Sequence, residues 1–367
     1  MYLNNIQLGQ VVLESLNRLK ATVPANLEEG VYDLRIVNPG GPAVVLVAAV
    51  RVKAVQAIVE HLFLPVTFKM DGWSEAKPAK RQTADWPTLG YDPSHSGYNQ
   101  VDPGGSRYAL AWSAALPYPG GSPLQQVAVA DGVLVASSDS YFGEAGVVAL
   151  SAESGEELWR YAFNDKFSIN PPSIAHSAVY FQQGNHSDDS YLFCLDLLNG
   201  RKNWQSTFYA QWEEYLAPLV VGSTVYVNAG ADGGMAAYHA GDGRELWWQS
   251  MPQYNSWTPA YADGSLYAWV AGFFSAHEPG TGDVKWSLDL GWPWYGYDME
   301  TAAVVVDSTA LVVNSEHLYA IDLVQRKARW SAPGDYRESL PAVADGVVYA
   351  LKSGLLEARQ LSDGTLL

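Results

Sequence analysis

The feature that most constrains this chain is a segment that recurs about every forty residues. In each copy an apolar strand leads into a turn, and a Trp follows four residues after a fixed turn position. That position is Gly in four of the five clearest copies and Arg326 in the fifth. These copies are Val147–Trp159, Leu192–Trp204, Met235–Trp247, Phe274–Trp286 and Leu318–Trp330. Such self-similarity indicates a repeat architecture, in which one small unit is stacked many times.

A second pair of short strands precedes the recurring segment. Val127–Ala136, Pro259–Ala268 and Pro341–Ala350 each place Asp-Gly between alternating apolar residues, which is a strong hairpin signal. Each unit thus offers about four short strands and no helical periodicity. A four-stranded sheet repeated about every forty residues predicts the blades of an all-β propeller.

The Trp positions set the number of blades. The repeat residues are Trp112, Trp159, Trp204, Trp247, Trp286 and Trp330, and we assign them a structural role. Their spacing predicts six blades, with seven as the alternative. We expect the ring to close with Ala109–Ala114 as the outer strand of the last blade, because closure removes exposed sheet edges.

The repeat resembles that of a known protein family. Its Ala-Leu-Asp-x-x-x-Gly-x-x-x-Trp pattern is similar to the pyrroloquinoline-quinone-like (PQQ-like) propeller repeat over residues 85–367. The segment Asp85–Gly97 resembles the lead-in that often precedes such propellers. The resemblance implies the fold and no single activity, because the family includes quinone dehydrogenases, outer-membrane assembly scaffolds and many surface proteins.

The N-terminal part has a different pattern. Ala21–Gly41 resembles the second half of an immunoglobulin-like IPT/TIG domain, so we interpret residues 1–68 as a partial β-sandwich and residues 69–84 as a linker. One end of the chain thus starts mid-domain, and the other stops one residue before an expected Trp. Two interpretations remain open: a fragment, or a polymer in which neighbouring subunits exchange strands.

Charge and composition exclude several classes of function. The formal net charge is −17, and residues 81–367 carry 14 Lys and Arg against 32 Asp and Glu. A nucleic-acid partner is not expected, because phosphate binding requires a basic face. The sequence has neither an apolar run long enough to span a membrane nor a signal peptide. The resemblance, and not a targeting signal, places the protein outside the cell or at its surface.

The Cys and His residues of the sequence do not form the patterns expected of a catalytic or metal-binding site. Cys194 is the single cysteine and lies in an apolar run, which predicts a buried structural thiol. The vicinal disulfide that the resemblance would imply for a quinone dehydrogenase therefore cannot form. The seven His residues show no zinc-helix spacing, and His239 occupies the turn position of Asp196 and Asp322 in its repeat. We expect no catalytic residues, no metal and no cofactor.

Aromatic side chains in the loops between blades form the candidate binding rim. They occupy equivalent places in three consecutive repeats, so we expect them to cluster. The interpretation leaves two alternatives: packing between blades, or a platform for sugars or a protein partner. The candidate residues are Trp212, Tyr215, Trp257, Trp292, Trp294, Tyr295 and Tyr297.

Together these patterns predict a non-catalytic extracellular or cell-surface module that mediates adhesion or self-assembly. Its partner would be itself, in an oligomer or a filament, or another surface protein. The first alternative is a carbohydrate-binding module that uses the aromatic rim. The second is a quinone-dependent or lyase-type enzyme with a site in the propeller channel.

Overall fold

A computed structural model describes two compact units, Met1–Arg81 and Gln82–Leu367. In the first unit it describes the backbone of seven strands. In the second it describes residues 85–101, 110–115, 126–138, 144–164, 168–184, 190–208, 214–229, 232–254, 256–291, 301–337 and 339–367. These residues form strands and turns and no helix, which confirms the all-β class.

The N-terminal unit contains two antiparallel sheets. The first has four strands in the order β2-β1-β5-β6, and the second has three in the order β3-β4-β7. Their bounds are β1 (Tyr2–Leu3), β2 (Ile6–Gln7), β3 (Gly9–Ser15), β4 (Arg18–Thr22), β5 (Gly30–Val37), β6 (Ala43–Val52) and β7 (Leu62–Pro65). The assignment of this unit to the IPT/TIG type stays a prediction.

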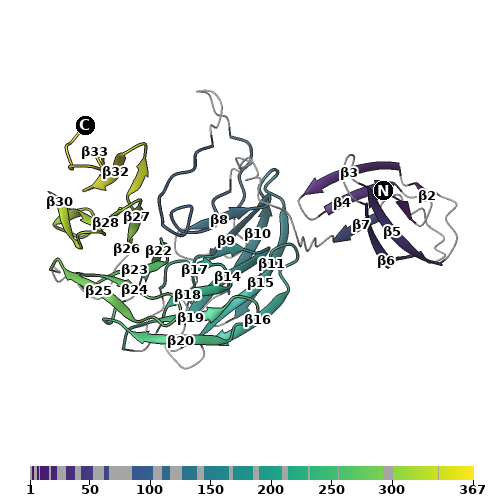
Figure 1. Cartoon of the computed structure of the whole chain (residues 1–367), viewed down its shortest axis with the longest axis horizontal. Helices are drawn as coiled ribbons and strands as arrows, with labels where there is room; N and C mark the ends of the chain where they lie inside the picture. Colours follow the sequence, from purple (N-terminus) through teal and green to yellow (C-terminus); the bar gives the residue numbers. More distant parts are fainter. Residues whose placement is uncertain are drawn as a thin grey trace. The chain divides into compact units, whose positions relative to one another are not determined.

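In the described residues, the second unit has six antiparallel sheets that follow one another along an arc (Figure 1). In the described residues, sheets 1 to 5 each have a four-stranded meander and sheet 6 has three named strands. Sheet 1 comprises β8 (Val127–Ala130), β9 (Val133–Ser138), β10 (Glu144–Ser151) and β11 (Glu157–Asn164). Sheet 2 comprises β13 (Ser173–Ala175), β14 (Ala178–Gly184), β15 (Tyr191–Asp196) and β16 (Lys202–Thr207), with β12 (Ser168–Ile169) beside β14.

The next sheets repeat this order. Sheet 3 comprises β17 (Leu219–Val221), β18 (Thr224–Asn228), β19 (Gly234–His239) and β20 (Glu245–Ser250). Sheet 4 comprises β22 (Ala260–Ala262), β23 (Ser265–Val270), β24 (Phe273–His277) and β25 (Val284–Asp289). Sheet 5 comprises β27 (Val304–Val306), β28 (Thr309–Val313), β29 (His317–Asp322) and β30 (Lys327–Pro333). Sheet 6 comprises β31 (Ala342–Ala344), β32 (Val347–Lys352) and β33 (Leu355–Gln360). The short strands β21 (Trp257–Thr258) and β26 (Thr301–Ala302) pair in parallel.

The predicted hairpins are present. Asp131, Asp263 and Asp345 have positive φ values of 51°, 46° and 50°, and the glycine after each is also at positive φ. Two successive residues in this conformation make the type I′ turn, whose twist matches that of the flanking strands. The Asp-Gly pairs therefore fix the register of the first hairpin in sheets 1, 4 and 6.

The repeat Trp joins each sheet to the next. A Cβ added at Gly200 would lie 2.6 Å from Cε3 of Trp159, so the indole rests directly on the glycine of the following sheet. The Trp159 Nε1 group also donates to the Leu197 carbonyl at 2.7 Å. The same contact joins Trp112 to Gly155, Trp204 to Gly243, Trp247 to Gly282 and Trp330 to Gly364. Arg326 takes the glycine position opposite Trp286, with its guanidinium carbon 5.8 Å from the ring centroid.

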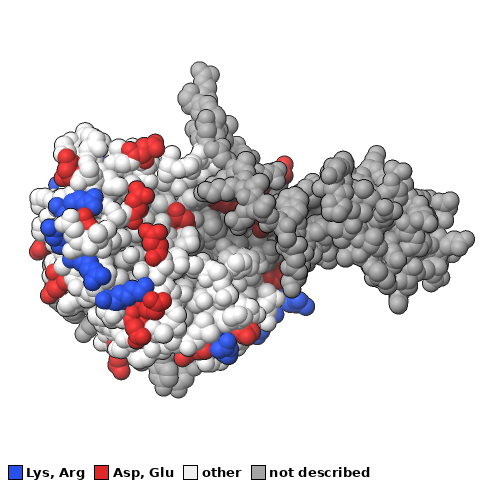
Figure 2. Space-filling view, viewed as in Figure 1, with Lys and Arg blue, Asp and Glu red and all other residues white. Residues whose placement is uncertain are grey.

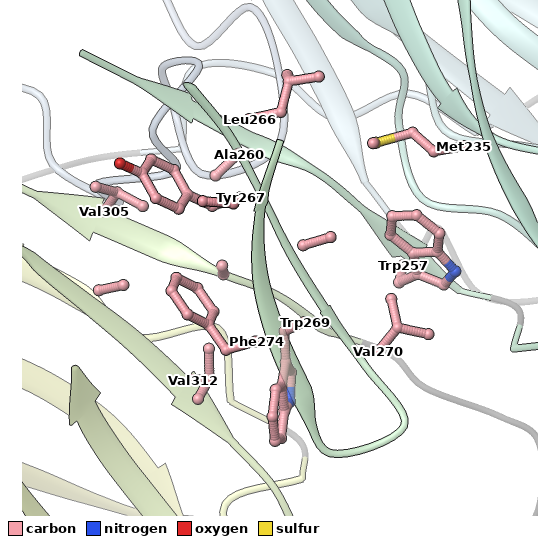
Figure 3. Packing of buried hydrophobic residues seen from close by; sticks show 14 of the residues in the cluster. Met235, Trp257, Ala260, Leu266, Tyr267, Trp269, Val270, Phe274, Val305 and Val312 are labelled. Carbon is pink, nitrogen blue, oxygen red and sulfur yellow. The ribbon is translucent and has the colours of Figure 1, made fainter. Parts of the chain in front are cut away.

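The hydrophobic core lies between consecutive sheets. Each sheet has a leading face, which packs on the next sheet, and a trailing face, which packs on the previous one. In sheet 4, for example, Tyr267 and Phe274 of the leading face lie against Val305 and Val312 of sheet 5 (Figure 3). Because both faces are covered, the middle strands are apolar almost throughout, as expected for a sheet buried on both sides.

The expected closing strand was wrong. Of Ala109–Ala114 the structure describes residues 110–114, and these form no strand. The outer edge of β33 is instead paired by the chain's own last residues, because Leu366 bridges Arg359 and the Leu367 amide donates to the Ala358 carbonyl. Trp112 lies on Gly155 of sheet 1, in the position that the other repeat Trp residues take on a following sheet.

Candidate functional site

The lead-in Asp85–Gly97, here called the central segment, lies against the inner strands. In five of the sheets, one backbone amide of the inner strand points away from its hairpin partner. That amide donates a hydrogen bond to a carbonyl oxygen of the central segment. The five pairs are Trp86 with Val129 (2.9 Å), Pro87 with Ile174 (2.7 Å), Pro93 with Tyr261 (2.7 Å), Ser94 with Val305 (2.8 Å) and Ser96 with Val343 (2.9 Å). An inner strand has no further strand to pair with, so these bonds satisfy amides that would otherwise lack a protein partner. One short segment thus bonds to sheets 1, 2, 4, 5 and 6.

Asp92 shapes the central segment. Its Oδ1 accepts bonds from the amides of Ser94 (3.1 Å) and Ser96 (3.0 Å) and from the Ser94 hydroxyl (2.8 Å). Its Oδ2 accepts the Ser96 hydroxyl at 2.7 Å. An Asp side chain that bonds to the backbone two residues on favours a turn. Here the turn presents the carbonyls of Pro93, Ser94 and Ser96 to three successive sheets.

His95 is fully buried within the same segment. Its Nδ1 bonds to the Ala303 carbonyl at 3.0 Å, and Nε2 has no hydrogen-bond partner. Burial lowers the pKa of His95 to about 4, because it outweighs the opposite effects of the Ala303 carbonyl and of Asp92. His95 is therefore neutral at physiological pH, with the proton on Nδ1.

The aromatic rim is only partly within the described residues. Tyr215 and Trp257 are both 1% exposed, so these two side chains are core residues and form no open platform. The Trp257 Nε1 group donates to the Tyr254 carbonyl at 3.1 Å, and the Tyr215 amide donates to Asn170 Oδ1 at 2.7 Å. Packing between sheets accounts for both, because each belongs to a buried hydrophobic cluster with strand residues of neighbouring sheets. Trp212, Trp292, Trp294, Tyr295 and Tyr297 lie outside the described residues.

The remaining polar candidates are structural. Cys194 is buried opposite Trp204, where the other repeats have Ala, and burial raises the pKa of its thiol to about 11. The His239 carbonyl accepts the turn amide of Gly243, as the Asp196 carbonyl does for Gly200, so His239 holds the equivalent position in its turn. Within the described part of the chain no three His, Cys, Asp or Glu side chains come together to hold a metal ion.

The leading face of sheet 6 is the surface that stands out. Tyr349 pairs with Ala358, just as Tyr180, Tyr226 and Tyr267 pair with Cys194, Ala237 and Ala276 in earlier sheets. Those three Tyr residues are 2%, 4% and 7% exposed beneath the next sheet, whereas Tyr349 is 39% exposed. Next to it, Leu351 pairs with Leu356, and these are 39% and 70% exposed. This face is built for burial, yet no described residue covers it.

No charged side chain belongs to this leading face. Because directly paired residues point to the same side of a sheet, its members follow from the register. They are Ala342, Ala344, Val347, Tyr349, Leu351, Leu356, Ala358 and Gln360. Elsewhere the outer edges of the sheets mix acidic and basic side chains, on the side of the molecule that Figure 2 shows. An exposed apolar surface of this kind usually marks an interaction site.

Comparison with known sequences now decides the family. The family described as outer membrane protein assembly factor BamB matches residues 105–211 and 147–366, which is more than half of the chain. The chain belongs to this family. The BamB-family match confirms the PQQ-like repeat and leaves the first unit outside the matched residues. In the described residues no helix is long and apolar enough to cross a membrane.

Solved structures agree on the fold. BamB from Moraxella catarrhalis matches with a TM-score of 0.55 and 18% identity, over 69% of this chain and 78% of that chain. The quinohemoprotein alcohol dehydrogenase ADHIIG from Pseudomonas putida HK5 matches with a TM-score of 0.54 and 15% identity, over 75% of this chain and 57% of that chain. Identities this low establish the β-propeller fold of this BamB-family chain and not its activity.

A curated relative shares one part of the chain. The serine/threonine-protein kinase AfsK of Streptomyces coelicolor (strain ATCC BAA-471 / A3(2) / M145) is 29% identical over 109 residues. The match covers 29% of this chain and 13% of the kinase, so the BamB-family chain spans a small fraction of that relative's length.

Proposed function

We propose that this protein is a non-catalytic interaction module, in which a rigid β-propeller presents a surface to protein partners. Adhesion and self-assembly, at the cell surface or outside the cell, are the roles that we assign to it. The observation that carries the proposal is the uncharged leading face of sheet 6, which has the composition of a buried face and stays open. Protein partners bury apolar surface of this kind.

The central segment supports a function on the outside of the propeller. An enzyme with a site in the channel needs backbone and side-chain groups on the inner strands that are free to bind a ligand. Here one inner-strand amide in each of five sheets is bonded to the central segment, and His95 of this segment is fully buried. These five inner-strand amides therefore stabilise the fold through the central segment and are not free to bind a ligand.

A quinone titration tests the non-catalytic part of the proposal. The purified full chain is titrated with PQQ and Ca²⁺ while its absorption spectrum is recorded, and dye reduction is then measured with a panel of alcohols. We expect neither a saturable spectral change nor alcohol-dependent reduction. Saturable quinone binding with dye reduction would overturn the proposal in favour of the enzyme.

A glycan array tests the choice of a protein over a carbohydrate partner. We expect no glycan to be retained, because the two described rim residues, Tyr215 and Trp257, are buried. Retention of one glycan class, abolished by Trp292→Ala and Trp294→Ala, would replace the protein-binding proposal with a carbohydrate-binding one.

A further inference from the structure

The central segment keeps its shape largely through hydrogen bonds within itself. The Gly97 amide donates to the Gly90 carbonyl at 2.9 Å, and the Tyr91 amide donates to the Thr88 carbonyl at 3.1 Å. Both oxygens of the Asp92 carboxylate also accept bonds from inside the segment. None of these bonds involves a sheet, so the turns of the segment persist when its bonds to the sheets break.

The attachments of the central segment to the sheets are few and separate. Trp86 exchanges two backbone bonds with Val129 of sheet 1, whereas sheets 2, 4, 5 and 6 each contribute a single inner-strand amide. The hydroxyl groups of Thr88 and Ser173 add a side-chain bond of 2.9 Å to sheet 2. Each of these inner strands also stays paired with the next strand of its hairpin. Release of the segment therefore leaves the hairpins intact.

His95 makes the bound arrangement less favourable than its contacts suggest. Its side chain is 0% exposed, and Nε2 has no hydrogen-bond partner, while Nδ1 bonds to the Ala303 carbonyl. A buried acceptor without a partner costs free energy, and water satisfies it once the group is exposed. This cost is present only while the segment is bound, so it favours release.

We propose that the central segment is a releasable strap. It moves as one unit between a closed state, bonded to five sheets, and an open state in which the sheets keep their fold. Opening exposes the inner-strand amides that the closed state occupies, namely those of Val129, Ile174, Tyr261, Val305 and Val343. The inference goes beyond the proposed function and does not depend on it.

Native-state hydrogen exchange of the full chain in low concentrations of urea tests the proposal. We expect the five amides to exchange together, with one common protection factor that lies about tenfold or more below that of the middle strands β23 and β28. Sheet 3 provides an internal reference. Its equivalent amide, that of Val220, has no bond to the described residues of the segment and should not follow the other five.

A disulfide that fastens the strap gives a second measurement. Thr88→Cys combined with Ser173→Cys replaces two hydroxyl groups that lie 2.9 Å apart, so mild oxidation should join the segment to sheet 2. Protection of the Tyr261, Val305 and Val343 amides should then rise by about tenfold or more, with the middle strands unchanged. The same variant kept reduced is the matched control. Cys194 is buried and takes no part.

A substitution that favours the open state gives the opposite result. A Cβ added at Gly97 would lie 2.7 Å from Cβ of Ala342 in sheet 6, a clash that opening relieves. Gly97→Ala should therefore lower the protection of the five amides by about tenfold or more. Gly346→Ala is the matched control, because Gly346 also has positive φ but open space around it. It should leave the Ile174 and Tyr261 amides as protected as in the unchanged chain.

Two results would overturn the inference. One is exchange of the five amides only through global unfolding, at the rate of the middle strands. The other is an oxidised disulfide that leaves Val343 as exposed to exchange as in the reduced variant, because the segment would then not move as one unit. Neither result bears on the interaction-module proposal, which the quinone titration and the glycan array test separately.

Discussion

The indole of Trp159 lies on the backbone of Gly200, with its Nε1 group bonded to the Leu197 carbonyl. The same contact recurs along the propeller except between sheets 4 and 5, where Arg326 replaces the glycine. It ties the outer strand of one sheet to a turn of the next. Gly200 has a φ of +68°, so the position requires both a left-handed backbone and the absence of a side chain.

Gly200→Ala should destabilise the propeller more than a left-handed backbone alone would. The methyl group would lie 2.6 Å from the Trp159 ring, so the ring must move. Gly132→Ala is the control, because Gly132 also has positive φ but open space around it. We expect a loss of about 1 kcal/mol for the control and about 1–3 kcal/mol more for Gly200→Ala, measured by urea unfolding. Equal losses would contradict the packing role of the indole.

Arg326 provides a natural test of the same position. It has a φ of +55°, which costs about 1 kcal/mol for a residue other than Gly, and its guanidinium lies over Trp286. A cation over an aromatic ring contributes about 0.5–1 kcal/mol. We therefore expect Arg326→Gly to unfold within about 0.5 kcal/mol of the unchanged chain, and Arg326→Ala to be less stable than Arg326→Gly. The reverse order in urea unfolding would refute this explanation.

Removing the Asp92 carboxylate should loosen the central segment. Asp92→Ala loses four hydrogen bonds to Ser94 and Ser96, which corresponds to about 2–4 kcal/mol. Asp92→Asn keeps one acceptor oxygen and should lose less. Hydrogen exchange reports the effect directly, because the Val305 and Val343 amides bond to this segment and should exchange faster. Asp232→Ala, at an exposed site, should leave both amides protected.

Stability should fall as pH drops from about 6.5 to about 4. His95 has a pKa of about 4 in the folded chain and about 6.5 when unfolded, so the unfolded state binds the extra proton in this range. The loss from His95 is on the order of 3 kcal/mol at pH 4. His95→Gln should flatten this slope in urea unfolding at several pH values.

Some of the slope should remain in His95→Gln, because burial also lowers the pKa of His277. His176→Gln is the control, since that side chain is exposed and bonds to the Gly222 carbonyl. A slope that His176→Gln reduces as much as His95→Gln does would assign the effect to surface histidines.

The fold could be predicted from the sequence because the signals that define the repeat lie close together in the chain. Asp-Gly fixes the first hairpin of sheets 1, 4 and 6, and the Gly and Trp that recur in the repeat join one sheet to the next. Each signal spans only a few residues of one repeat, so it can be recognised in the sequence without the tertiary structure. The same locality explains why Cys194 was correctly expected in the core: it takes the Ala position opposite a repeat Trp.

The tertiary structure decided where side chains distant in sequence meet. The sequence predicted that Tyr215 and Trp257 belong to a binding rim, yet both side chains are buried in hydrophobic clusters. The sequence identified Asp85–Gly97 only as a lead-in, and nothing local shows that this segment bonds to inner strands as distant in sequence as Val343.

The open face of sheet 6 follows the same rule. Its sequence, Tyr349 and Leu351 opposite Ala358 and Leu356, is that of a covered face, and the sequence alone predicts burial for it. Exposure depends on which sheet packs on which, and that is a property of the assembled chain. Local chemistry therefore determined the blade, whereas long-range packing determined the place of the central segment and which faces of the sheets are covered.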